Sequence, residues 1–122
     1  MKRLFLTLSV LFSLNSAFAE TYVCSFRQDN AAMRVRFDFD SSMENAKVTI
    51  YRSNRVQISH QTRGCSDGDG DGWDLVLRDR NHPQYKYHLF FDAMYLDSLV
   101  LSMPGMPKQE IDNCRRLYSP RN

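Results

Sequence analysis

An alternation of apolar and charged residues with a period of two constrains this chain more than any other feature. Between Met33 and Asp40 the segment MRVRFDFD alternates four apolar side chains with four charged ones. Successive side chains of a β-strand point to opposite faces, so this segment predicts a strand with one face on a core and the other in water. We therefore expect a sheet that is half-buried.

Six further segments alternate in a similar way, and polar or proline-containing turns separate them. The expected strands cover residues 22–27, 33–40, 46–51, 56–61, 73–78, 85–91 and 98–103. About seven short strands with mostly hairpin-length connections predict an all-β, mainly antiparallel meander, closed as a small barrel or folded as a sandwich. Helix is scarce, but the pattern of residues 108–117 allows a short C-terminal helix.

The first 19 residues are predicted to be a bacterial secretory signal peptide. A cationic start, MKR, precedes an apolar run of 11 residues, and Ala17-Phe18-Ala19 places small residues where a signal peptidase cleaves. A membrane-spanning helix needs about 20 apolar residues, so we expect no membrane span. Cleavage after Ala19 would leave a single β-rich domain over residues 20–122, located in the periplasm or secreted.

The charge balance of that domain excludes one class of partner. The whole chain has a net charge of +2, but Lys2 and Arg3 belong to the predicted signal, which leaves 14 basic and 14 acidic residues. A neutral domain offers no compositional reason to expect binding to nucleic acid or to an anionic membrane.

The chain has three cysteines: Cys24, Cys65 and Cys114. We expect export to place them in an oxidising compartment, where a disulfide is favoured. Loop entropy gives about 4–5 kcal/mol for each of the three possible pairings and does not choose among them. Cys24 shares a strand face with Tyr22 and Phe26, and Cys114 lies in a tail that would otherwise fray, so we favour Cys24–Cys114. Cys65 is then buried, free or intermolecular, and the protein is a monomer or a Cys65-linked dimer.

The segment SDGDGDGWD contains a candidate metal site. Asp67, Asp69 and Asp71 at a spacing of two, followed by glycine, match the start of an EF-hand calcium loop. Position twelve is Arg78, where that loop needs a glutamate, and the flanking segments alternate as strands do, so we exclude an EF-hand. Two interpretations remain: a solvated hairpin connection, or a strand-flanked Ca²⁺ site that uses these aspartates, Asp74 and backbone carbonyls. No other cofactor is expected.

Sequence motifs of enzymes are missing. The chain has no nucleophile elbow, HExxH, CxxC or glycine-rich phosphate loop. Of its three histidines, His82 lies in a turn before Pro83, His88 lies on the polar face of its strand, and His60 reads as a histidine at the edge of the core. An uncharacterised hydrolase therefore ranks third among the functional hypotheses, after a binding protein and a calcium-stabilised structural module.

A candidate binding surface comes from the polar faces of two expected strands. Tyr51 points away from the face that carries Val48 and Ile50, and Arg34 and Arg36 lie on the charged face of their strand. Tyrosine and arginine are enriched in binding patches, so these three residues are the predicted binding surface.

The overall layout of the domain resembles that of the periplasmic C-type lysozyme inhibitors. The likeness rests on an exported domain of about 100 residues, an early Tyr22-Val23-Cys24, meander periodicity and a late cysteine, Cys114. It implies a small β-barrel with a disulfide that ties the chain ends. The Ser-Gly-x-Arg-Tyr motif of that family's inhibitory loop is absent, and the nearest fragment, residues 61–65, does not match, so no functional residue is transferred.

These observations favour a small exported protein that acts by binding and not by catalysis. Its expected partner is another protein or a component of the cell envelope, and a loop-borne inhibitor of a hydrolase is one concrete version. The alternative is a structural β-module that calcium stabilises through residues 67–74.

Overall fold

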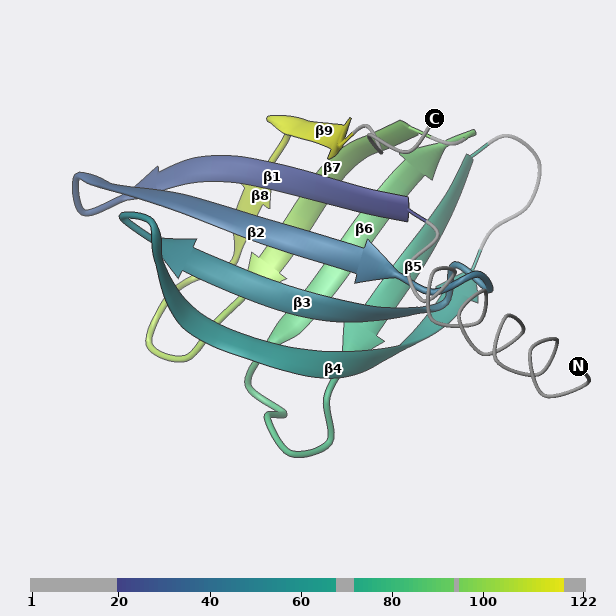
Figure 1. The fold of residues 1–122 in the computed structure, drawn as a ribbon, viewed down its shortest axis with the longest axis horizontal. Coiled ribbons are helices and arrows are strands. Elements are labelled where there is room, and N and C mark those ends of the chain that lie inside the picture. The colour runs from purple at the N-terminus through teal and green to yellow at the C-terminus, as the bar shows by residue number, and fades with distance from the viewer. Residues whose placement is uncertain (1–19, 68–71, 94, 118–122) are drawn as a thin grey trace, which may run out of the picture.

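The structure, a computed structural model, describes residues 20–67, 72–93 and 95–117. These residues form nine strands in one antiparallel sheet (Figure 1), and they contain no helix, hence none that is long and apolar enough to cross a membrane. The strands are β1 (Glu20–Gln28), β2 (Ala31–Phe39), β3 (Asn45–Arg52), β4 (Arg55–Asp67), β5 (Gly72–Arg78), β6 (Lys86–Asp92), β7 (Tyr95–Ser102), β8 (Gln109–Ile111) and β9 (Cys114–Leu117).

The sheet curls into a nearly closed barrel. Its strand order is β8-β7-β6-β5-β4-β3-β2-β1-β9, so β1 to β8 pair in chain order and β9 returns to pair with β1. Strand β9 also contacts β7, and β1 contacts β8, which brings the two ends of the sheet together (Figure 1). The predicted all-β antiparallel meander is therefore confirmed.

Two of the hairpins close with tight turns. Asp29 and Asn30 have φ angles of 51° and 67°, and Ser53 and Asn54 have φ angles of 51° and 68°. Two successive residues with positive φ are typical of a type I′ turn, whose twist matches that of the flanking strands. The second of these turns joins the expected strands 46–51 and 56–61, and β4 begins directly after it at Arg55.

Alternation places one side of each strand inside the barrel. In β2, Met33 and Val35 are buried, whereas Arg34 between them is exposed. Phe37 is fully buried as well. Aromatic side chains meet edge to face across the core, with ring centroids 5.5 Å apart for Tyr22 and Phe91. Burial of these inward side chains supplies the main force that closes the sheet.

The predicted disulfide between Cys24 and Cys114 is present. The two residues are direct partners in the β1–β9 ladder, and the bond closes 90 positions of sequence. Cys65 is a free and exposed cysteine on β4, which runs on to Asp67 instead of ending near Gln61.

The prediction of a short C-terminal helix at residues 108–117 is wrong. That segment forms β8 and β9, which explains why the sheet has nine strands and not seven. Unpaired backbone groups along the outer edges of β7 and β1 favour strand addition, with Ile111 opposite Leu99 and Cys114 opposite Cys24. Pairing with distant strands therefore overrides the local pattern.

Candidate functional site

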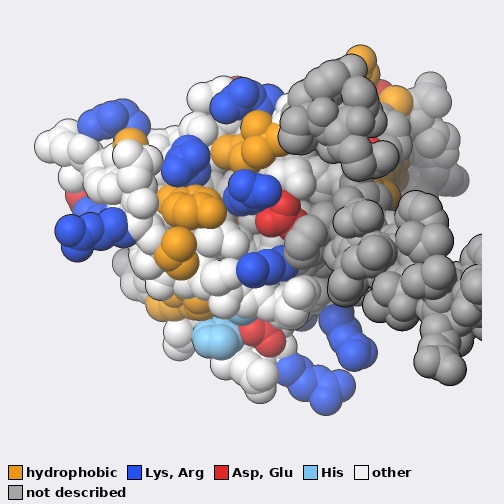
Figure 2. All heavy atoms as spheres, in the orientation of Figure 1, with side chains coloured by type: hydrophobic (Ala, Val, Ile, Leu, Met, Phe, Trp, Pro, Cys, Tyr) orange, Lys and Arg blue, Asp and Glu red, His pale blue; other side chains and the backbone are white. Residues whose placement is uncertain are grey.

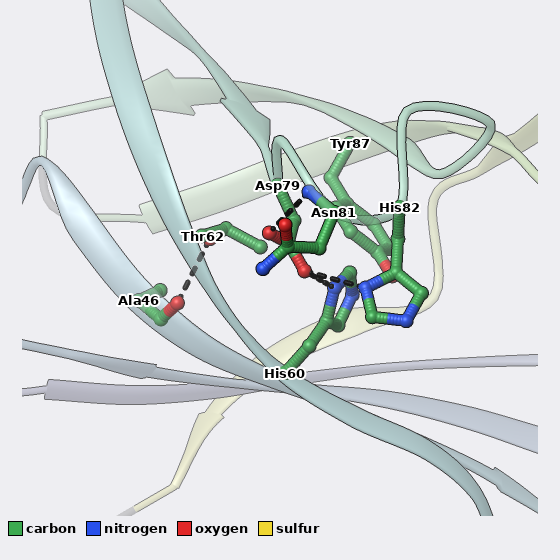
Figure 3. Close-up of polar contacts among 7 residues, drawn as sticks. All are labelled: Ala46, His60, Thr62, Asp79, Asn81, His82 and Tyr87. Carbon is green, nitrogen blue, oxygen red and sulfur yellow. Dashed lines mark hydrogen bonds and ion pairs between the residues drawn. The ribbon is translucent and has the colours of Figure 1, made fainter.

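Two histidines and an aspartate converge where β4, β5 and the β5–β6 connection meet. His60 comes from β4, Asp79 directly follows β5, and His82 lies in the connection (Figure 3). Nδ1 of His60 lies 2.9 Å from Oδ2 of Asp79, and Nδ1 of His82 lies 2.7 Å from the same oxygen. We call these three residues the histidine–aspartate cluster.

The carboxylate of Asp79 is charged at neutral pH. Hydrogen bonds from His82 and then His60 lower the pKa of Asp79 from 3.8 to about 2. An ionised carboxylate only accepts hydrogen bonds, so both Nδ1 atoms carry a proton in this arrangement. The backbone N–H of Asn81 donates to the second oxygen, Oδ1, at 3.1 Å. The orientation of the carboxylate is thus fixed by three donors.

Tyr87 fixes the other side of the His60 ring. Nε2 of His60 lies 2.8 Å from the hydroxyl of Tyr87, a residue of β6 that is fully buried. Burial raises the pKa of Tyr87, so its hydroxyl stays protonated and can both donate and accept. The imidazole of His60 is therefore held at both nitrogens.

The cluster runs from the core to the surface. The side chain of His60 is 4% exposed, that of Asp79 is 12% exposed, and that of His82 is 45% exposed. Backbone hydrogen bonds from His82 to Asp79 (3.0 Å) and from Tyr85 to His82 (3.1 Å) fold the connection into turns. A compact connection thus presents a polar, partly accessible site at one end of the barrel.

An open hollow of about 840 Å³ borders the cluster. Its lining is mostly cationic and comprises Gln61, Arg63, Arg78, Asp79, Arg80, Pro83 and Lys86. We call it the cationic hollow. Within the described residues, its three arginines and its lysine make no ion pair and no side-chain hydrogen bond.

Strand register explains why these cations gather. Arg63 is the direct partner of Arg78 in the β4–β5 ladder, and Arg78 is the direct partner of Lys86 in the β5–β6 ladder. Like charges directly opposite each other on neighbouring strands destabilise a sheet. Three adjacent strands therefore present an uncompensated row of positive charge.

The predicted binding surface lies on the strands β2 and β3. Arg34 and Tyr51 are direct partners, and the guanidinium carbon of Arg34 lies 4.8 Å from the centre of the Tyr51 ring. Val56, which is 58% exposed, is the partner of Tyr51 on β4. We call Arg34, Tyr51 and Val56 the aromatic row. Arg36 lies two residues from Arg34 and pairs with Asp38 at 3.1 Å.

The space-filling view agrees with a mixed surface of this kind. Apolar side chains are interspersed with Lys and Arg side chains on the face that β1 to β4 form (Figure 2). Such a mixture of aromatic, apolar and arginine side chains is typical of protein interfaces.

The four predicted calcium ligands are only partly described. Asp67 ends β4 and is the direct backbone partner of Asp74 on β5, whereas Asp69 and Asp71 lie outside the described residues. An oxygen of Asp74 lies 2.8 Å from Nε2 of His88, so that carboxylate has a partner within the sheet. Calcium binding at this loop stays a prediction.

Sequence reasoning missed the histidine–aspartate cluster. It read His60 as a histidine at the edge of the core, which agrees with its burial, and it placed His82 in a turn. The spacing of Asp79 and His82, three residues apart in a turn, was a usable signal for that pair. Nothing local points from either residue to His60, which is 19 positions before Asp79.

Comparison with known proteins finds no match for this chain among family models, curated proteins or solved structures. We therefore infer function from the geometry and chemistry of the described residues.

Proposed function

We propose that the protein is a small exported binding protein without catalytic activity, and that its cationic hollow recognises an acidic segment of a partner protein. One observation carries this proposal: four cations around one hollow make no ion pair and no side-chain hydrogen bond with the residues that the structure describes. They are Arg63, Arg78, Arg80 and Lys86. Asp79, the one acidic residue of the lining, has its carboxylate engaged by His60 and His82, so a carboxylate-bearing partner would supply the negative charge that pairs with these four cations.

The energetics favour an anionic partner. Arg63, Arg78 and Lys86 repel one another in the free protein, and this unfavourable term is relieved when a carboxylate binds between them. Arginine forms two parallel hydrogen bonds to a carboxylate, which adds orientation to the attraction. Residues 20–122 are neutral as a whole, so the attraction comes from the local arrangement of charge and would speed encounter with an acidic surface.

The aromatic row supports a protein as the partner. Tyr51 and Val56 expose apolar surface next to the guanidinium of Arg34, a composition that favours protein contacts over contacts with a purely polar polymer. A partner could contact the row and the hollow separately, because Val56 of the row and Arg63 of the hollow lie at different places along β4.

Export is part of the proposal. The predicted signal peptide at residues 1–19 would direct the chain to the periplasm or outside the cell, and the disulfide between Cys24 and Cys114 is compatible with an oxidising compartment.

A binding role is proposed over hydrolysis because of how the histidines are used. Nδ1 of His60 and Nδ1 of His82 both donate a hydrogen bond to Asp79. Within the described part of the chain, the only hydroxyl bonded to either ring belongs to Tyr87, which is buried and therefore poorly placed to act as a nucleophile. Cys65 is exposed on the outside of the sheet whereas His60 points into the barrel, so these two residues do not form a dyad.

A calcium-stabilised structural module is the second candidate. The observation in its favour is that Asp67 and Asp74 are direct backbone partners in the β4–β5 ladder.

The test is binding of a glutamate-rich peptide, measured by titration calorimetry at low salt. We expect binding by the natural protein and a loss of at least tenfold in affinity for the double variant Arg63→Glu/Arg78→Glu. The control Arg55→Glu/Arg115→Glu makes the same change in net charge at exposed positions outside the hollow. Equal binding by both double variants would refute the proposal. Binding of an anionic polysaccharide in place of the peptide would replace the protein partner by an envelope polymer.

A further inference from the structure

We propose that His60, Asp79 and His82 form a binding site for a divalent transition-metal ion of the Zn²⁺ class. The three donor atoms all lie within 4.8 Å of one another, although His60 is 19 positions before Asp79 in the chain. This inference rests on the geometry of the histidine–aspartate cluster and is independent of the anion binding proposed above.

The donor set selects the kind of ion. Two imidazole nitrogens and one carboxylate oxygen suit Zn²⁺, Co²⁺ or Ni²⁺, whereas Ca²⁺ and Mg²⁺ prefer sets made of oxygen alone. Three protein ligands with a position left for water or another ligand are common in open zinc sites. Asp79 also lines the cationic hollow, so the remaining position would border that hollow.

The donor atoms must move to surround an ion: the two contacts to Asp79 must lengthen, and the ligand atoms of His60 and His82, which lie within 4.8 Å of each other, must approach by at most about 1.5 Å. Donors that surround Zn²⁺ tetrahedrally at about 2.0–2.1 Å from the ion are about 3.3 Å from one another. The two contacts to Oδ2 of Asp79 measure 2.9 Å and 2.7 Å, so each must lengthen by about 0.5 Å. His82 is half-exposed on a connection between strands, and its side chain can move by this amount without disturbing the core.

The protons can be accounted for on each ring. The ion takes the place of the Nδ1 proton of His60 and of His82. In a neutral imidazole that proton moves to Nε2 by exchange with solvent, so each metal-bound ring stays neutral and carries its proton on Nε2. The Nε2–H of His60 then donates to the hydroxyl oxygen of Tyr87 at 2.8 Å. Metal-binding histidines usually donate their second N–H to such a partner, which orients the ring. The Asn81 N–H orients the carboxylate in the same way.

The other histidine–carboxylate pair of the described residues lacks this arrangement. His88 and Asp74 contact each other at 2.8 Å, but no third ligand lies near enough to complete a set. This pair therefore offers a matched control. The nearby arginines of the hollow oppose a bound cation, which limits the affinity without removing the donor set.

The experiment uses Co²⁺ as a spectroscopic probe for the Zn²⁺ site. Purified protein without a histidine tag is treated with chelator, dialysed and titrated with Co²⁺, and then Zn²⁺ is used to displace the Co²⁺. We expect visible d–d absorption that saturates at one ion per chain and disappears on addition of Zn²⁺. Loss of an orienting partner costs about 10–100-fold in metal affinity, so His82→Ala, which removes a ligand, should cost at least about 100-fold.

Two controls separate this site from incidental binding. His88→Ala should bind Co²⁺ as the natural protein does, and so should Cys65→Ser, which removes the free thiol. Circular dichroism of each variant checks that the sheet is intact. The proposal is overturned by the absence of saturable d–d absorption, by an equal effect of His82→Ala and His88→Ala, or by loss of the signal in Cys65→Ser.

Discussion

Replacement of Asp79 by asparagine tests the histidine–aspartate cluster most directly. The change removes the charge that accepts hydrogen bonds from His60 and His82, one of which is almost fully buried. A hydrogen bond to a charged group contributes about 1.5–3 kcal/mol, and the amide oxygen can still accept one bond, so we expect a loss of about 2 kcal/mol in the free energy of unfolding. For a domain of about 100 residues this lowers the melting temperature by roughly 8–16 °C.

The effect should depend on pH with a defined sign. Because the pKa of Asp79 is lowered from 3.8 to about 2 in the folded protein, the carboxylate stabilises the fold above pH 4, and this contribution is lost as the pH falls through about 2. The difference in stability between the natural protein and Asp79→Asn should therefore be constant near neutral pH and shrink between pH 4 and pH 2.

Thermal and urea unfolding, followed by circular dichroism in the presence of chelator, measures this difference without a contribution from metal. Asp97→Asn is the control, because Asp97 is exposed and has no hydrogen bond or ion pair among the described residues. We expect Asp97→Asn to lie within about 0.5 kcal/mol of the natural protein. Equal stability of the two variants, or a difference for Asp79→Asn that persists unchanged at pH 2, would refute the reasoning.

Three further predictions concern the rest of the fold. Cys24→Ser/Cys114→Ser removes a bridge across 90 positions and should cost about 4–5 kcal/mol, seen as a lower urea midpoint; an unchanged midpoint would mean that the bridge does not constrain the chain. Gly64→Ala should cost at least about 1–3 kcal/mol in the same assay, because the added methyl would collide with the backbone oxygen of Glu44, and a neutral effect would contradict that close approach. If residues 67–74 bind calcium, millimolar calcium should raise the melting temperature by several degrees over chelator, and no shift removes the calcium interpretation.

The strands and the core could be predicted from sequence because alternation is a local signal. Val35 and Phe37 repeat with the period that the strand itself imposes, and the structure buries them as expected. The C-terminal tail could not be predicted in this way. Its strands form because β7 and β1 offer unpaired edges, and those edges exist only once the whole sheet has assembled.

The candidate site depends on information that the sequence does not show directly. The row of Arg63, Arg78 and Lys86 follows from the register of three strands, and a shift by one residue would send each side chain to the other face. His60 and Tyr87 are 27 positions apart, and the pairing of β4 with β5 and of β5 with β6 brings them together. By contrast, the pairing of Cys24 with Cys114 could be predicted, because one inward cysteine and one loose tail restrict the choice.

The central claim is that the cationic hollow is where an acidic partner binds. Chemical-shift mapping by two-dimensional ¹⁵N NMR, with a glutamate-rich peptide added to the labelled protein, tests it residue by residue. We expect the shifts to concentrate at residues 61–63, 78–83 and 86 and to weaken as salt is added. Shifts that are absent, or that gather at Arg34, Tyr51 and Val56 while the hollow is unaffected, would contradict the claim.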